Sequence, residues 1–253
     1  CPPTVENREQ FLQAVRNSGS IGLGGAGFPT SLKLGFDPKE KQPDFLIING
    51  AECEPYITSD YRCFMEEGED VLEGVLLMLK YLGIPKCIIG IEKNKPKAIE
   101  KMTRLCEKHD NITVKALKSS YPQGAEKTLI FSTTGRVVKE GTLPLASGCI
   151  VVNSSTAAFI AQYIRTGMPL VKRRITVDGN IVKKPSNFIV PVGMSIGEIV
   201  YYAELSDKPD RIILGGPMMG ACAFDPDYPL SKTNNAVLMF ADSPVYEPSE
   251  CIR

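Results

Sequence analysis

The sequence predicts an α/β fold, with a Rossmann-like domain on a parallel sheet followed by a small β-grasp-like domain. Over the first two thirds of the chain, short apolar strands alternate with amphipathic helices, which predicts a parallel sheet covered by helices. Near residue 171 the pattern changes to alternating strand residues and tight turns. We therefore expect domains at 1–170 and 171–242, and the start of a further segment at 243–253.

In the first domain, each expected element follows from its apolar spacing. A first helix over 6–17 carries its apolar residues on one face. Four apolar runs are too short for helices and indicate buried strands, at 45–48, 87–91, 112–117 and 149–152. The intervening helices are expected at 66–82, from 96, near 125–131, and after residue 153, where Ser154 or Ser155 would cap the helix and Gly167 would end it.

The second domain is expected to begin with a hairpin. Residues 174–177 alternate, Asp178-Gly179 forms a turn, and residues 181–182 return as the second strand. Further strands are expected at 188–192, 211–214 and 237–240, with a short helix from Ser195 to Ala203. A glycine-rich loop, 215–220, lies inside this domain.

Composition excludes several classes of protein. The 29 Lys and Arg residues balance the 29 Asp and Glu residues, so no basic excess favours nucleic acid. No apolar run approaches the roughly 20 residues of a membrane-spanning helix. The eight cysteines form no CxxC pair and no export signal is visible, which favours free thiols in a reducing compartment.

The glycine loop, residues 22–27, is the strongest functional signal. Glycine lets the backbone approach a ligand closely, and successive N–H groups can form a nest for phosphate. Lys33 adds a point charge suited to a phosphate. The loop also matches G-x-G-x-x-G, but a helix precedes it and Pro29 follows, so the dinucleotide-binding context is absent. We predict a phosphorylated cofactor; the alternative is a glycine-rich turn without a ligand.

Three segments that follow strands, 49–54, 121–126 and 153–156, are expected to line one crevice, because ligands bind beyond the carboxyl ends of such strands. Glu52 and Glu54 would project the same way and accept hydrogen bonds from sugar hydroxyls, unless they form a solvated acidic turn. Phe28 and Phe36 would sandwich a purine, unless both are core residues. The single histidine and the lack of a nucleophile triad favour a redox cofactor.

Several motifs in order resemble those of a known family: GLGGAGFPTSLKLGF, INGAECEPYITSDYR, YPQGAEKTL, TGRVVKEGTLP and GGPMMG. They resemble the C subunit of the Rnf electron-transport complex, which is similar to the NADH-binding flavoprotein subunit of respiratory complex I. The resemblance spans residues 18–241. It implies an NADH-dependent flavin oxidoreductase that moves electrons between ferredoxin and NAD through FMN, in an ion-translocating complex. The protein would bind the other subunits of that complex on the cytoplasmic side of the membrane.

The resemblance also implies which residues bind the cofactors, and it implies no catalytic side chain. Residues expected to hold FMN or the nicotinamide ribose are Gly22, Gly24, Gly25, Lys33, Asn49, Glu52, Glu54, Tyr121, Gly124, Glu126, Asn153, Ser154 and Thr156. Phe28 and Phe36 would stack on the NADH adenine. Two [4Fe–4S] clusters belong to the family, and Cys251 would ligate one in a longer chain. Because the sequence stops one residue short of the next motif cysteine, we expect no cluster in this fragment.

Three departures from the complex I pattern lie on the nucleotide side: Leu23 stands for an arginine, Ala51 for an aspartate and Ala125 for a glutamate. They keep two alternatives open. The region is either a docking module without hydride transfer, or a relative of NADH-dependent cobalamin reductases with another acceptor.

Overall fold

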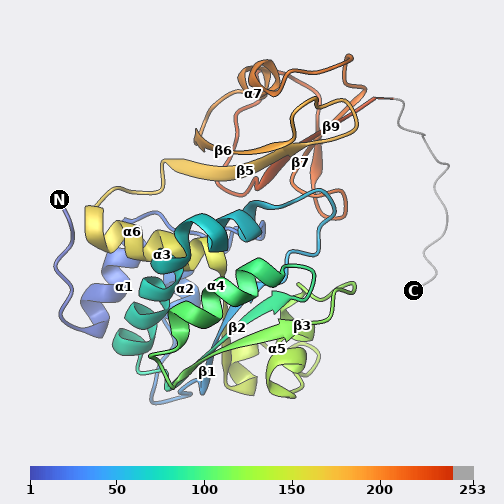
Figure 1. Ribbon diagram of the computed structural model, residues 1–253. Coiled ribbons are helices and arrows are strands. Elements are labelled where there is room, and N and C mark those ends of the chain that lie inside the picture. Colours follow the sequence, from blue (N-terminus) through green and yellow to red (C-terminus); the bar gives the residue numbers. More distant parts are fainter. Residues whose placement is uncertain (242–253) are drawn as a thin grey trace.

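The computed structural model describes residues 1–241 and confirms the α/β class, with one parallel sheet and a second, smaller sheet (Figure 1). The parallel-sheet region comprises α1 (Arg8–Asn17), α2 (Thr30–Leu34), β1 (Phe45–Gly50), α3 (Ser59–Leu82), β2 (Lys86–Glu92), α4 (Pro96–Cys106), β3 (Ile112–Leu117), α5 (Glu126–Thr134), the 3₁₀ helix η1 (Pro144–Ser147), β4 (Cys149–Asn153) and α6 (Ser154–Thr166). The mixed-sheet region comprises β5 (Lys172–Asp178), β6 (Ser186–Pro191), α7 (Ile196–Ala203), β7 (Arg211–Leu214), β8 (Ala221–Ala223) and β9 (Ala236–Phe240).

The parallel sheet has the strand order β3-β2-β1-β4. From β1 the chain builds outward to β2 and β3 on one side, and β4 then returns to pair with β1 on the other. The order therefore reverses between β1 and β4, where open α/β sheets form a ligand crevice at their carboxyl ends. Asn49 and Asn153 stand opposite each other at this point.

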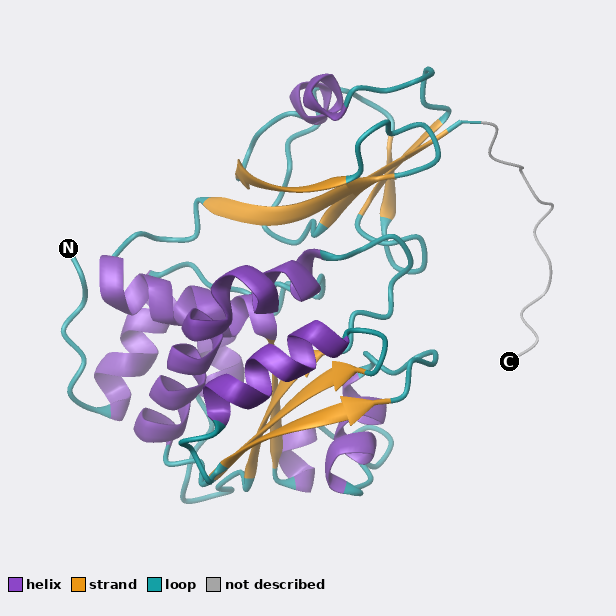
Figure 2. Ribbon diagram, viewed as in Figure 1, coloured by secondary structure: helices purple, strands orange, loops and turns teal. Residues whose placement is uncertain are grey.

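Helices cover both faces of the parallel sheet (Figure 2). Leu129 and Ile130 of α5 pack with Ile47 on one face. On the other face, α1, α3, α4 and α6 bury a larger core around Leu46 and Ile48. Successive β1 side chains point to opposite faces, so an unbroken apolar run is what a strand buried on both sides requires.

Helix α3 begins at Ser59 rather than at residue 66 as expected. Its first turn is polar and carries no apolar periodicity, so the pattern revealed only the later turns. The Glu52 side chain caps this turn by accepting hydrogen bonds from the amides of Asp60 and Tyr61. A break in helical geometry at Glu67 separates the two parts. The cap of α6 is Asn153, rather than Ser154 or Ser155.

The expected hairpin is present with a different second strand. Strand β5 pairs antiparallel with β6, and Val182 makes only an isolated bridge with Leu205. The turn at Gly179 packs so closely against β9 that a Cβ there would overlap the Met239 carbonyl oxygen. Strand β9 pairs in parallel with β5, which gives the mixed sheet the order β6-β5-β9-β7-β8. The short strand β8 was not expected.

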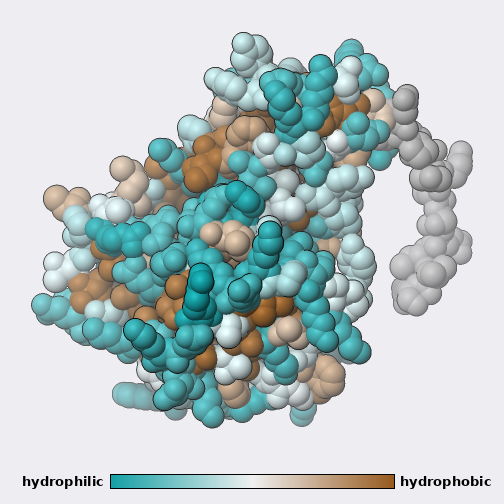
Figure 3. Space-filling view, viewed as in Figure 1, coloured by the Kyte–Doolittle hydropathy of each residue, from teal (hydrophilic) through white to brown (hydrophobic). Residues whose placement is uncertain are grey.

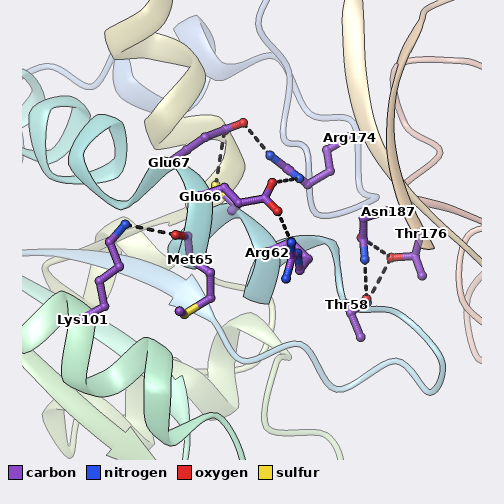
Figure 4. A network of polar contacts seen from close by, with 10 residues as sticks. Thr58, Arg62, Met65, Glu66, Glu67, Lys101, Arg174, Thr176 and Asn187 are labelled. Atoms are coloured by element: carbon purple, nitrogen blue, oxygen red, sulfur yellow. Dashed lines mark hydrogen bonds and ion pairs between the residues drawn. The ribbon is translucent and has the colours of Figure 1, made fainter. Parts of the chain in front are cut away.

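The two regions meet along β5. In Figure 4, Arg174 reaches from β5 to the carboxylates of Glu66 and Glu67 on α3. Apolar contacts between Ile57 and β9 add to this interface. On the face drawn in Figure 3, apolar surface gathers along β5 and β6 and over part of the helical layer. Within residues 1–241, no helix combines the length and apolar character that crossing a bilayer demands.

Candidate functional site

A cavity of about 260 Å³ lies at the carboxyl ends of β1 and β4, where the strand order reverses. Its size is close to the lower end of small-ligand sites. Segments far apart in the sequence line this cavity together, and three of them lie at the ends of strands, as the sequence predicts. The lining residues are Gly22, Gly24, Ala26, Phe28, Thr30, Lys33, Asn49, Gly124, Glu126, Val151, Val152, Asn153 and Thr156. We call it the glycine-loop cavity.

The glycine loop holds its own shape with few of its amides. The Gly22 amide donates to the Phe28 carbonyl at 2.8 Å, and the Gly27 amide donates back to the Gly22 carbonyl at 3.2 Å. Among the described residues, the amides from Gly24 to Ala26 have no acceptor. Gly25 has φ +109°, and no protein atom lies within 4 Å of the place where its Cβ would stand. The loop therefore offers unused donors beside open space, which suits an anion.

Lys33 reaches the same cavity from the short helix α2. Its ammonium donates to Glu126 Oε1 at 2.8 Å and to the Val151 carbonyl at 3.0 Å. An ammonium has three donors, so one remains for a ligand. The Glu126 carboxylate offsets part of the Lys33 charge. Lys33 would therefore act on a ligand through its remaining charge and through the fixed direction of its third N–H donor.

The two asparagines shape the cavity and hold its loops. Asn49 donates to the Gly124 carbonyl at 3.0 Å, which joins the loops after β1 and β3. Asn153 accepts the amides of Ser155 and Thr156, while its own amide donates to Asp60 at 2.8 Å. Helices α5 and α6 both begin at this cavity, so the partial positive charge of two N-termini faces it.

The predicted site residues divide between two cavities. Glu52, Glu54 and Tyr121 do not line the glycine-loop cavity; they line a second, more polar one of about 340 Å³. We call it the acidic cavity, because its wall also carries Glu92 and Asp178. Ser154 is fully buried and lines neither cavity, and Gly25 is not among the lining residues either, although its neighbours Gly24 and Ala26 are.

Glu52 belongs to a buried carboxylate pair. It accepts the amides of Asp60 at 2.8 Å and Tyr61 at 3.2 Å. Burial, with the neighbouring charge of Asp60 as a second cause, raises the pKa of Glu52 to about 7. Burial also raises the pKa of Asp60, against the opposing hydrogen bonds from Asn153 and Ser155. The two carboxylates lie close together and partly shielded from water at the start of α3, which disfavours two full negative charges.

Glu54 connects the parallel-sheet region to the loop 215–220. Its carboxylate accepts the Met218 amide at 3.0 Å. A Cβ on Gly216 would overlap that carboxylate, so only glycine permits the loop to close so tightly around it. Glu54 therefore has a structural partner in addition to any ligand.

The two phenylalanines do not form a pair. Phe28 is 50% exposed at the glycine-loop cavity, whereas Phe36 is 6% exposed in the core, with the Arg8 guanidinium over its ring. The core alternative holds for Phe36, and it cannot stack on a purine here. Cys251 lies outside the described residues. Within the described chain, no cluster of His, Cys, Asp or Glu has the arrangement of a metal site.

Sequence reasoning missed Asp60 and Arg173, which both support the site from behind. Asp60 orients Asn153, and Arg173 donates to the Leu23 carbonyl of the glycine loop. The sequence did contain a signal for Arg173. Alternate residues of a strand point to the same face, so Arg173 shares the buried face of β5 with Ile175 and Val177. A buried arginine in an apolar series indicates a specific polar partner.

Comparison with known proteins places this geometry among flavin-binding domains. The family of the Nuo51 FMN-binding domain matches residues 15–162. The C subunit of the proton-translocating ferredoxin:NAD(+) oxidoreductase complex of Clostridium ljungdahlii is 40% identical over 248 residues, covering 97% of this chain and 54% of that protein. The Na(+)-translocating counterpart of Acetobacterium woodii is also 40% identical, covering 96% of this chain and 56% of that protein.

The C subunit of an ion-translocating oxidoreductase complex of Rhodobacter capsulatus is 36% identical to this chain. The match covers 97% of this chain and 48% of that protein. The chain thus spans about half the length of these curated relatives. Among solved structures, a chain of an NAD+-reducing [NiFe]-hydrogenase in the H2-reduced state superposes with a TM-score of 0.79 at 23% identity, covering 94% of this chain and 48% of that chain. At that identity the likeness concerns the fold.

Proposed function

Since the chain belongs to the family of the Nuo51 FMN-binding domain, we propose that its glycine-loop cavity binds FMN and that the protein transfers electrons through it. The observation that carries this proposal is the row of unused amides from Gly24 to Ala26 beside open space, with the Lys33 ammonium on the same cavity. Backbone donors and an ammonium are the groups that bind a phosphate monoester.

The other cavity residues have supporting roles in this proposal. Thr156 and the N-terminus of α6 lie on the side of the glycine loop and suit the phosphate. Asn49, Gly124 and Glu126 also line the cavity, where they would bound the flavin. When bound, FMN supplies both one-electron and hydride chemistry, and the protein contributes position and electrostatics.

We further propose NAD(H) as the hydride partner, with Phe28 available to stack on its adenine and with Glu54 and Tyr121 on the nicotinamide side. Ferredoxin and two [4Fe–4S] clusters, one ligated by Cys251 in a longer chain, would exchange single electrons with the flavin. The names of the relatives support a place in an ion-translocating complex. We propose that the protein docks against the other subunits on the cytoplasmic side of the membrane.

The test is reconstitution of the chain with FMN under anaerobic conditions, followed by NADH. We expect saturable quenching of flavin fluorescence at one FMN per chain, and then bleaching of the flavin absorption band. Absence of saturable FMN uptake would overturn the proposal.

A docking module without hydride transfer is the second candidate. The core position of Phe36 favours it, because one of two expected adenine contacts is missing. It predicts FMN uptake without bleaching by NADH, even in the longer chain with both clusters restored.

A further inference from the structure

Leu23 of the glycine loop is held on both sides, through the two peptide units that flank its Cα. Its N–H donates to the hydroxyl of Thr156 on α6 at 2.9 Å. Its carbonyl accepts a hydrogen bond from the guanidinium of Arg173 on β5. Leu23 itself is buried, so neither bond competes with bulk water. One residue of the loop is thus fixed by both regions of the molecule.

Arg173 is a buried cation whose partners are carbonyls. Its guanidinium also donates to the carbonyls of Lys232 and Asn234, and no carboxylate of the described residues pairs with it. Burial lowers the pKa of Arg173 to about 10, with the charge of Asp60 opposing, so the group stays cationic at neutral pH. The planar fork of a guanidinium holds three acceptors in fixed directions, which an ammonium cannot do.

Two further contacts place the segment 232–234 against the loop. The Lys232 ammonium donates to the Gly19 carbonyl at 2.9 Å. A Cβ on Gly27 would lie 2.6 Å from the Thr233 methyl group, so the segment lies directly against the loop backbone. The mixed-sheet region therefore forms the back of the glycine loop, while the cavity lies at its front.

The geometry of the peptide unit sets the direction of the Gly24 N–H. The carbonyl of Leu23 and the N–H of Gly24 belong to one planar trans peptide and point in opposite directions. A carbonyl held toward Arg173 therefore turns the Gly24 N–H away from the mixed-sheet region. Gly24 lines the cavity, and its amide has no acceptor among the described residues.

We propose that Arg173 is a positioning residue for the binding of a phosphate monoester at the glycine loop, acting through the Leu23 carbonyl on the Gly24 amide. The inference rests on the proposed FMN site. A charged donor on the carbonyl also polarises the peptide, which strengthens the N–H as a donor. The mixed-sheet region would thereby contribute to phosphate recognition without contacting the ligand.

The neighbouring Arg174 offers a matched control. It joins the same two regions, through ion pairs with Glu66 and Glu67 on α3, but it contacts no part of the glycine loop (Figure 4). Arg174→Gln therefore weakens the contact between the regions without releasing the Leu23 carbonyl.

The experiment measures the affinities of FMN and of riboflavin, which lacks the phosphate, for the wild type, Arg173→Gln and Arg174→Gln. We expect Arg173→Gln to reduce FMN affinity about tenfold, the size of one hydrogen bond to a charged group, and to leave riboflavin affinity within about twofold. Arg174→Gln should keep the preference of the wild type for FMN over riboflavin.

An unchanged preference in Arg173→Gln, or an equal loss for both flavins, would overturn the positioning role while leaving the FMN site intact. A wild type that takes up neither flavin would overturn the proposed function itself. If Arg173→Gln does not fold by circular dichroism, Arg173→Lys is measured in the same way, and a reduced preference for FMN over riboflavin is expected because an ammonium cannot hold all three carbonyls in the same directions.

Discussion

The two cavities at the carboxyl edge of the parallel sheet are built from opposite chemistry. The glycine-loop cavity presents backbone amides, the Lys33 ammonium and two helix N-termini. The acidic cavity presents the carboxylates of Glu52, Glu54 and Glu92. The glycine-loop cavity takes Asn49 from the end of β1, and the acidic cavity takes Glu52 and Glu54 from the loop that follows this strand.

This difference in charge predicts which part of a nucleotide each of the two cavities would bind. A phosphate is stabilised by amides and an ammonium, and carboxylates repel it. Sugar hydroxyls, in contrast, donate well to carboxylates. In the proposed site, this charge pattern would orient a flavin or nicotinamide nucleotide across the edge of the sheet.

The largest expected effect is that of Gly25→Val, which would disable the proposed phosphate site at the glycine loop. A Cβ at this position meets no protein atom, but it fills the open space beside the free amides and forces a side chain into positive φ. We expect FMN affinity to fall by more than about a hundredfold, because both the space and the amide directions are lost, at about 1.4 kcal/mol per factor of ten.

Gly141→Val is the matched control for Gly25→Val. Gly141 also has positive φ, +71°, and open space at its Cβ position, but it lies outside the glycine loop, and neither of its chain neighbours lines a described cavity. Both variants should lose similar stability, about 1–2 kcal/mol, in chemical denaturation. If Gly141→Val weakened FMN binding as much as Gly25→Val does, backbone strain rather than the cavity would explain the loss.

Lys33→Ala should give the next largest effect. It removes one charge-assisted contact to phosphate, worth about 1.5–3 kcal/mol when buried, and the lower end applies because Lys33 is partly exposed. It also leaves the Glu126 carboxylate unpaired at the cavity. Fluorescence titration should show FMN affinity about tenfold weaker, and addition of Glu126→Gln should restore part of it. Unchanged FMN affinity in Lys33→Ala would remove the lysine from the phosphate site.

The local chemistry of the first cavity was predictable from the sequence, and that of the second was not. Glycines with a nearby lysine favour a phosphate loop, and the carboxyl ends of parallel strands must meet at one edge. The role of Glu52 depends on where α3 begins, which its own polar first turn does not reveal.

Burial of individual side chains was also beyond local reasoning. Phe28 and Phe36 have similar sequence surroundings, yet only Phe36 packs against the core. Their difference arises from α1, which brings Arg8 over the Phe36 ring. Likewise, Arg173 contacts the glycine loop only because the mixed-sheet region folds behind it. Such contacts between distant segments carry no short-range signature.

The acidic side is tested by the pH dependence of stability in Glu52→Gln. The ordinary pKa of a glutamate, 4.5, applies to Glu52 in the unfolded chain, and its folded-state pKa is about 7, so the folded state binds the extra proton. The stabilising contribution of that proton is therefore fully present below about pH 4.5 and is lost as pH rises through 7. We expect the unfolding free energy of the wild type to fall over this range by on the order of 1–3 kcal/mol more than that of Glu52→Gln.

Denaturant titrations at several pH values measure this difference, with Asp60→Asn as the control. Removal of the Asp60 charge takes away one cause of the raised Glu52 pKa, so the fall in stability should move to lower pH. Parallel pH profiles for the wild type and Glu52→Gln would show that Glu52 binds no extra proton in the folded state, and its full negative charge would then add to the electrostatic contrast between the cavities.

The smallest expected effect is that of Phe28→Ala, which tests whether the exposed ring serves a ligand. Because Phe28 is half exposed, its loss should cost the fold little, while a stacked adenine would lose about 0.5–1.5 kcal/mol. NADH affinity should therefore weaken by about three- to tenfold, with FMN affinity unchanged. Leu32→Ala removes a similarly exposed apolar side chain that lines neither cavity and should change neither affinity. Equal NADH affinity in Phe28→Ala and the wild type would mean that both aromatic positions of the family motif have become structural, which is the outcome that the docking module predicts.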